Sequence, residues 1–211
     1  MSTLVIQHGE DEPPGLVGAA LGKYEVCRTW LGERVPDALT HDALVVLGGP
    51  MAAWDDERHP HLAAEARLLA AYARAGRPTL GVCLGSQLLA RGLGARNFRG
   101  PALEKGLLPI SLTDAGRSDA LVRGFDGATV VQWHGDSFSL PDGAVWLASS
   151  ASYAHQAFRV GERAWGLQFH VECDRALRRV WGFDAGSDDI DTRNRGLAER
   201  FAELVILSAR R

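Results

Sequence analysis

The chain of 211 residues has few cysteines, no long apolar run and no large excess of charge of one sign. Its three cysteines are too few and too unevenly matched for a disulfide framework. No apolar run approaches the roughly 18 residues of a membrane-spanning helix, and the N-terminus lacks the basic segment of a signal peptide. From these absences we expect a cytoplasmic protein with reduced thiols.

The charge balance and the lack of repeats narrow the possibilities further. Lys and Arg number 23 and Asp and Glu number 26, which predicts neither nucleic acid nor an anionic membrane as a partner. The composition is 46% hydrophobic and 23% charged, as is ordinary for a globular protein. Without repeats, low-complexity segments or linkers, residues 1–211 are expected to form one domain.

Short apolar runs alternate with segments of helical spacing through the first half of the chain. The predicted strands are residues 3–7, 24–28, 43–47 and 79–82. The predicted helices are residues 15–21, 61–75 and 86–91. Strands and helices in this order predict right-handed βαβ units, and therefore an α/β fold with an open, mostly parallel sheet and helices on both faces.

The second half has a different pattern, with strand-like runs separated by glycine and proline turns. The runs are residues 107–112, 128–133, 145–148, 157–160 and 164–169. They predict an antiparallel extension of the sheet. The chain then returns to helix, at about residues 174–182 and 193–209.

The sequence Gly81-Val82-Cys83-Leu84-Gly85 lies where a predicted strand passes into a helix. A nucleophile between two glycines at such a junction indicates a nucleophile elbow, here with Cys in place of Ser. Glycines suit the strained turn because side chains would collide there. The N-terminus of the following helix favours a thiolate on Cys83, and the Leu84 N–H can bind an oxyanion. The alternative is a structural cysteine buried in a tight turn.

A cysteine nucleophile needs a base, and the base needs a group that orients it. His170 ends an apolar strand, and Glu172 follows two residues later. Residues i and i+2 of an extended chain point to the same side. Glu172 can therefore accept a hydrogen bond from the imidazole and fix its tautomer. A histidine alone at a strand end is more often structural, so this interpretation depends on Cys83.

Four stretches together resemble the class I glutamine amidotransferases, the type with a Cys-His-Glu triad. They occur in the order expected for that family and spread over most of the chain. Within the family the chain looks similar to stand-alone proteins with a domain like the glutaminase domain of GMP synthetase. The matching stretches are residues 47–51, 81–87, 132–138 and 166–172.

The resemblance implies that Cys83 attacks the γ-carbonyl of glutamine or of a γ-glutamyl compound. Ammonia or an amine leaves, and water hydrolyses the thioester with His170 as general base. The resemblance also implies oxyanion donors at Gly49 and Leu84, and no cofactor. The loop of residues 133–138 would close on the α-amino and α-carboxylate end, with Asp136 as the partner of the ammonium. The implied substrate contacts are Gln87, Trp133, His134, Gly135 and Asp136.

Two departures from the family pattern leave the function open. Val171 stands where the family commonly has proline between His and Glu, which makes the geometry there less defined. No synthetase domain follows, so we expect any ammonia acceptor to be a separate protein. The candidates are a glutaminase subunit, a stand-alone γ-glutamyl hydrolase and a silent binding module, and the intact triad argues against the last.

The remaining histidines and cysteines predict no further site. His59 and His61 flank a proline, but no cluster of Cys, Asp or Glu accompanies them at ligand spacing, so we predict no metal. Cys27 and Cys173 are expected to pack as small buried hydrophobic residues.

Overall fold

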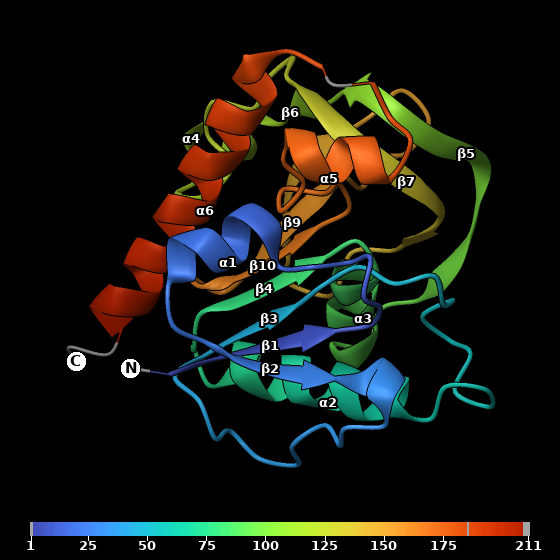
Figure 1. The fold of residues 1–211 in the computed structure, drawn as a ribbon, viewed down its shortest axis with the longest axis vertical. Coiled ribbons are helices and arrows are strands. Elements are labelled where there is room, and N and C mark those ends of the chain that lie inside the picture. The colour runs from blue at the N-terminus through green and yellow to red at the C-terminus, as the bar shows by residue number, and fades with distance from the viewer. Residues whose placement is uncertain (1, 185, 209–211) are drawn as a thin grey trace.

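An eight-stranded sheet forms the centre of the computed structural model, which describes residues 2–184 and 186–208 (Figure 1). The strand order is β2-β1-β3-β4-β10-β9-β8-β6. Five strands are parallel: β1 (Thr3–Gln7), β2 (Glu25–Arg28), β3 (Ala43–Val46), β4 (Thr79–Val82) and β10 (Ala164–Leu167). The antiparallel strands are β9 (Ala157–Val160), β8 (Val145–Ser149) and β6 (Ser111–Leu112). The predicted fold class, with its antiparallel extension, is confirmed.

Two further strands lie outside the main sheet, and the run predicted at residues 107–112 is divided between one of them and β6. β5 (Asn97–Pro109) and β7 (Thr129–Phe138) pair only with each other, as an antiparallel ribbon. The register between them shifts between Arg99 and Glu104, as at a β-bulge. Such a shift bends and twists a strand. In Figure 1 the ribbon arches beyond the end of the sheet. Trp133 of β7 lies beside Cys83, whose Sγ is 3.8 Å from the Trp133 carbonyl oxygen.

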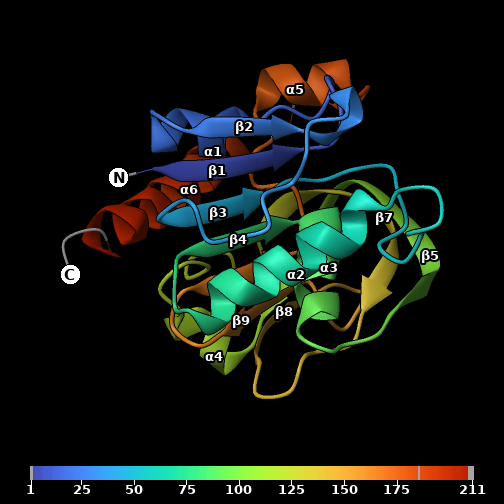
Figure 2. The ribbon, with the colours of Figure 1, turned by 90° about the horizontal axis from the view of Figure 1, so that it is seen from below.

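Helices cover both faces of the sheet (Figure 2). Alternate residues of β1 show the two layers: Val5 belongs to one hydrophobic core, whereas Leu4 and Ile6 belong to the other. This is the alternation expected of a strand that is buried on both faces. On the Val5 side lie α1 (Gly15–Leu21) and α6 (Asp188–Ser208), and on the other side lie α2 (His61–Arg74) and α3 (Leu84–Gly92).

The helices differ from the prediction mainly at their starts. α6 begins at Asp188, before the predicted residue 193, and the predicted end at residue 209 lies outside the described residues. α3 begins at Leu84 and not at 86. The short helices are η1 (Thr29–Leu31), α4 (Asp114–Ser118) and α5 (Arg175–Val180).

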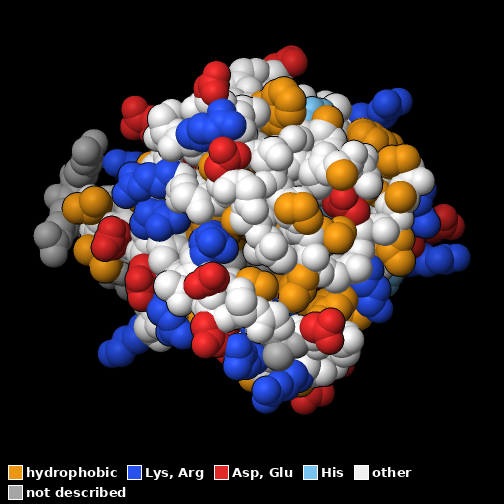
Figure 3. Space-filling view, turned by 90° about the horizontal axis from the view of Figure 1, so that it is seen from above, with side chains coloured by type: hydrophobic (Ala, Val, Ile, Leu, Met, Phe, Trp, Pro, Cys, Tyr) orange, Lys and Arg blue, Asp and Glu red, His pale blue; other side chains and the backbone are white. Residues whose placement is uncertain are grey.

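The distribution of surface charge and the character of the helices are relevant to nucleic-acid and membrane partners. Basic and acidic side chains lie close to one another across the face in Figure 3. Among the described helices, none combines the length and apolar character that crossing a bilayer would require.

The turn between β4 and α3 is a strained one. Cys83 has φ 49° and ψ −107°, and among the described residues it is the non-glycine residue with positive φ. Its N–H donates to the Leu167 carbonyl at 2.8 Å, which ties the turn to β10. A Cβ on Gly81 would overlap the Gly85 carbonyl, and a Cβ on Gly85 would overlap the Val46 carbonyl. The two glycines are therefore a steric requirement of the predicted elbow.

Substituting Gly85 tests this requirement. Gly85→Ala should lower the free energy of unfolding by about 1–3 kcal/mol or more, because its Cβ has no space against β3. Gly196→Ala is the matched control: its Cβ meets Arg200 at an ordinary 3.5 Å inside α6, and alanine there should stabilise by about 0.5–1 kcal/mol. Urea denaturation of both variants measures the difference. Equal stabilities would contradict the packing argument.

Candidate active site

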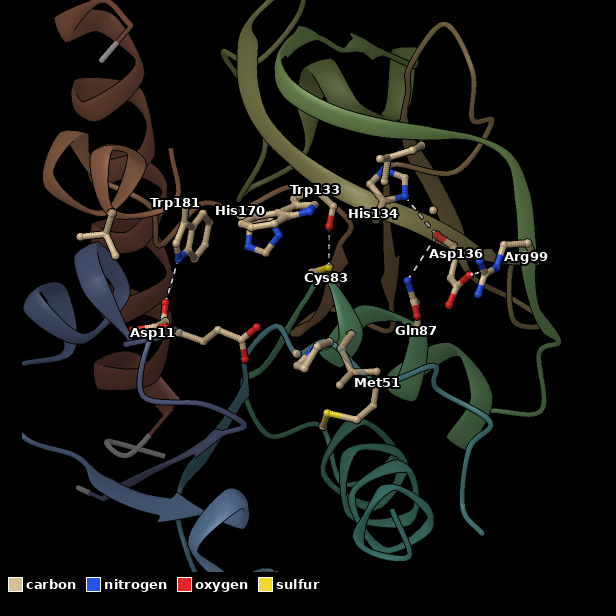
Figure 4. A pocket seen from close by; sticks show the side chains of 17 residues that line it. Asp11, Met51, Cys83, Gln87, Arg99, Trp133, His134, Asp136, His170 and Trp181 are labelled. Atoms are coloured by element: carbon tan, nitrogen blue, oxygen red, sulfur yellow. Dashed lines mark hydrogen bonds and ion pairs between the residues drawn. The ribbon is translucent and has the colours of Figure 1, made fainter. Parts of the chain in front are cut away.

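A cavity of about 560 Å³ opens over Cys83, at the carboxyl end of β4 (Figure 4). In open α/β sheets, ligands bind outside the carboxyl ends of the strands. Glu172 does not line the cavity and lies behind His170. The other predicted site residues all line it: Gly49, Cys83, Leu84, Gln87, Trp133, His134, Gly135, Asp136 and His170.

The structure brings Cys83, His170 and Glu172 together. The prediction that His170 ends a strand is wrong, because β10 ends at Leu167 and residues 171–172 form a turn. His170 Nδ1 lies 2.7 Å from Glu172 Oε1, and both side chains are buried. With Nδ1 engaged by the carboxylate, Nε2 is the ring nitrogen left for Cys83. His170 and Cys83 both lie against Gly48, since a Cβ on Gly48 would be 3.1 Å from His170 Cε1 and 3.6 Å from Cys83 Cβ. Val171, which stands where the family commonly has proline, leaves the His170–Glu172 contact intact and is itself fully buried in the core.

The environment of His170 favours its charged form. Burial by itself lowers the pKa of the imidazole, but the charges of Glu172 and Cys83 and the hydrogen bonds to both outweigh it, so the pKa lies well above 6.5. Protonated His170 therefore stabilises the folded chain fully below pH 6.5. This contribution is lost as the pH rises through the raised pKa. An imidazolium beside the thiol is the arrangement that activates cysteine nucleophiles.

Two further groups contact the sulfur of Cys83. Gln168 Nε2 donates toward Sγ at 3.6 Å, and Sγ lies 3.8 Å from the Trp133 carbonyl oxygen. The Gln168 side chain is itself held, because its Oε1 accepts from Gln87 Nε2 at 3.2 Å. An amide N–H directed at sulfur favours negative charge on it.

Gly49 and Leu84, the predicted oxyanion donors, both line the cavity. Leu84 is the first residue of α3, so its N–H has no acceptor within the helix. Neither N–H has a hydrogen-bond acceptor among the described residues. A Cβ on Gly49 would lie 2.7 Å from Leu84 Cδ2. A side chain at Gly49 would therefore require the Leu84 side chain to move and would crowd His8, whose Cβ would lie 3.1 Å away.

The predicted substrate contacts on β7 are arranged unequally. The Asp136 carboxylate forms an ion pair with Arg99 at 2.9 Å, so it is not free for a substrate ammonium alone. His134 is buried, with Nδ1 3.0 Å from the Asp136 carbonyl oxygen and Nε2 3.2 Å from Glu104. Burial lowers the pKa of His134 despite that carboxylate. Both nitrogens of the His134 ring are therefore engaged by other groups of the protein, and little of the ring is exposed to the cavity. The Trp133 ring packs against Trp181 and faces the cavity more openly.

The sequence analysis missed several residues that line the cavity. Figure 4 shows Asp11 and Trp181 on the opposite side of Cys83 from Arg99. Glu12 lies beside Asp11; its Oε2 is buried without a hydrogen-bond partner among the described residues, and burial raises the pKa of its carboxyl. Asp11 and Glu12 follow β1, whose carboxyl end was a usable signal. Arg99 and Trp181 gave none, because the β5–β7 ribbon and α5 bring them there.

Comparison with known proteins agrees with this geometry. The family model described as glutamine amidotransferase class-I matches residues 23–178. A glutamine amidotransferase-like protein of Salmonella typhimurium, YfeJ, is 38% identical over 150 residues, which cover 69% of this chain and 63% of YfeJ. The glutamine-hydrolysing GMP synthase of Porphyromonas gingivalis is 31% identical over 150 residues, covering 69% of this chain and 28% of that protein. The matched part of the chain thus spans less than two thirds of either relative.

Solved structures match over nearly the whole chain. A glutamine amidotransferase of Thermotoga maritima superposes with a TM-score of 0.87 at 29% identity, covering 97% of this chain and 98% of that one. One of Methylobacillus flagellatus gives a TM-score of 0.86 at 25% identity, covering 98% and 94%.

The His170–Glu172 pair can be tested by titration. Glu172→Gln should lower the pKa of His170, because the carboxylate charge is the largest influence that raises it. NMR titration of the His170 Cε1–H measures this pKa. Glu162→Gln, at an exposed position between β9 and β10, is the matched control and should leave it unchanged. An unaltered His170 pKa in Glu172→Gln would contradict the charge argument.

Thiol reactivity should separate the three free cysteines. Burial raises the pKa of Cys27 to about 11 and raises that of Cys173 further. Neither forms much thiolate at pH 8, whereas Cys83 opens into the cavity beside His170. Brief iodoacetamide treatment at pH 8 should therefore label Cys83 first, as peptide mass spectrometry would show. Labelling of Cys27 or Cys173 at an equal rate would refute this order.

Proposed function

Because the chain belongs to the class I glutamine amidotransferase family, we propose that it cleaves the γ-glutamyl amide bond of glutamine, or of a related γ-glutamyl compound, through a thioester on Cys83. The observation that carries the proposal is the strained Cys83 next to the buried His170–Glu172 pair. The name of the GMP synthase relatives, glutamine-hydrolysing, supports glutamine as the substrate. The free thiols of Cys27, Cys83 and Cys173 support a reducing, cytoplasmic location.

The first half of the reaction forms the thioester. The Cys83 thiolate attacks the γ-carbonyl carbon, a C–S bond forms, and the carbonyl oxygen becomes an oxyanion. The N–H groups of Gly49 and Leu84 bind that oxyanion, and in a site shielded from water such donors are worth several kcal/mol to the transition state. The His170 imidazolium gives its proton to the departing nitrogen as the C–N bond breaks, and ammonia or an amine leaves.

The second half restores the enzyme. Water attacks the thioester carbon while neutral His170 takes its proton, and the same N–H pair binds the second oxyanion. Collapse breaks the C–S bond and releases glutamate and the Cys83 thiolate. Glu172 keeps the same ring nitrogen directed at the reacting atoms in both halves and stabilises the imidazolium.

The polar residues beside Cys83 suggest how the glutamyl group lies. The Arg99–Asp136 pair offers one positive and one negative group, which match the α-carboxylate and α-ammonium of an amino acid. Gln87 lies next to this pair and donates to the Asp136 carbonyl at 3.3 Å. We place the α-amino acid end here. The leaving group then points toward Asp11 and Trp181, on the other side of Cys83.

A second candidate is a stand-alone γ-glutamyl hydrolase whose leaving group is an amine or a peptide. The size of the cavity favours it, since about 560 Å³ lies within the range of about 300–1,000 Å³ that accommodates drug-sized molecules. Ammonia needs far less room. If glutamine is the substrate, a separate synthetase is the proposed acceptor of the ammonia. The third alternative is a binding module without catalytic activity.

Glutamate release from L-glutamine and from a panel of γ-glutamyl dipeptides tests the proposal. Wild type should release glutamate from at least one of them, and Cys83→Ala should abolish turnover because no thioester can form. Faster release from dipeptides would favour the stand-alone hydrolase. A Cys83→Ala variant as active as wild type would overturn the proposal, and Cys27→Ala is the control for loss of an unrelated thiol.

A further inference from the structure

A buried histidine that the reaction does not use lies directly behind the proposed oxyanion site. His8 follows β1 and is fully enclosed as a side chain. Its Nδ1 lies 2.7 Å from the Gly48 carbonyl oxygen, and its Nε2 lies 2.8 Å from Glu65 Oε2. The other oxygen of Glu65, also fully buried, lies 2.8 Å from His61 Nδ1. The network therefore runs from α2 through Glu65 and His8 to the Gly48 carbonyl.

The partners of His8 define its proton positions. A carbonyl oxygen only accepts hydrogen bonds, so Nδ1 of His8 carries a proton. An ionised carboxylate also only accepts, so Nε2 carries one too. Burial alone would lower the pKa of His8, yet the charge and hydrogen bond of Glu65 raise it above 6.5 overall. The pKa of Glu65 is lowered by His8 and His61 against the effect of burial. Both directions indicate a charged pair.

The planarity of the peptide bond carries the effect into the cavity. In a trans peptide the C=O of one residue and the N–H of the next point in opposite directions. A Gly48 carbonyl bound to His8 therefore turns the Gly49 N–H away from His8. Gly49 lines the cavity and lies against Leu84. This peptide joins two glycines, which restrain their backbone least, so an added hydrogen bond is needed to hold one orientation.

We propose that His8 is a positioning residue, which locks the Gly48–Gly49 peptide so that the Gly49 N–H faces the oxyanion. The inference rests on the proposed function and adds a part to it. Glu65 and His61 act indirectly: Glu65 keeps His8 protonated and its ring fixed, and His61 holds Glu65 in place. Without the His8 hydrogen bond, the peptide can rotate and present a carbonyl oxygen where the oxyanion forms. That orientation repels negative charge.

Two substitutions of His8 separate its two hydrogen bonds. The amide nitrogen of Asn can take the place of Nδ1 and donate to Gly48, whereas that of Gln takes the place of Nε2 and reaches Glu65. His8→Gln should lower kcat by about 10²–10³-fold, the cost of losing one oxyanion donor, with KM changed little. His8→Asn should keep kcat within about tenfold of wild type. Iodoacetamide alkylation of Cys83 should be equal in all three proteins, because that reaction forms no oxyanion.

Several results would overturn the inference. Equal losses of kcat in both variants would do so, as would unchanged kcat in His8→Gln or a parallel loss of Cys83 alkylation. A crystal structure of His8→Gln with the Gly48 carbonyl still in its wild-type direction would also do so, and this readout needs no turnover. Failure of the proposed function is distinct, since wild type itself would then release no glutamate.

The three ligand atoms of His8, His61 and Glu65 lie within 4.8 Å of one another, so a metal ion is the competing occupant. Purified protein should contain no divalent ion in stoichiometric amount by elemental analysis. A stoichiometric ion that His61→Ala loses would replace the hydrogen-bond network with a metal site and overturn the proposal.

Discussion

The backbone of Cys83 is the constraint on which the site depends. Its φ of 49° is unfavourable for a residue with a side chain and is held by the packing around it. Because Gly81 and Gly85 have no side chains, α3 and β3 can pack directly against the turn. The hydrogen bond from the Cys83 N–H to the Leu167 carbonyl connects the turn to β10 as well. Three elements therefore fix one residue, and the sulfur is presented at the sheet edge beside the first N–H groups of α3.

Three buried histidine–carboxylate pairs surround this cysteine, and their environments give them different properties. In His170–Glu172 and His8–Glu65 the attraction of the carboxylate outweighs burial, and the histidine pKa is raised. In His134 burial outweighs the attraction of Glu104, and the pKa is lowered. The first pair lies beside Cys83, the second contacts the Gly48 carbonyl, and the third links β7 to β5. The same two side-chain types thus serve three tasks.

The cavity combines parts from distant segments. Its floor comes from the parallel sheet, and its walls come from the β5–β7 ribbon and from the segment after α5. The ribbon brings Arg99 to Asp136, and the segment after α5 places Trp181 edge-on against His170, with ring centroids 4.9 Å apart. In the proposed reaction, these walls would set the room for the leaving group, and therefore the choice between glutamine and larger γ-glutamyl compounds.

The sequence by itself determined what depends on neighbours along the chain. Glycine spacing predicted the elbow at Cys83. Closeness along the chain predicted the contact of His170 with Glu172, although the structure makes it in a turn after β10 and not on extended chain. Only the tertiary structure decided which groups meet across the fold. His8 and Glu65 are 57 residues apart, and Arg99 reaches Asp136 through the register of two strands. Such pairings depend on how the elements pack, and the spacing of residues along the chain does not predict that packing.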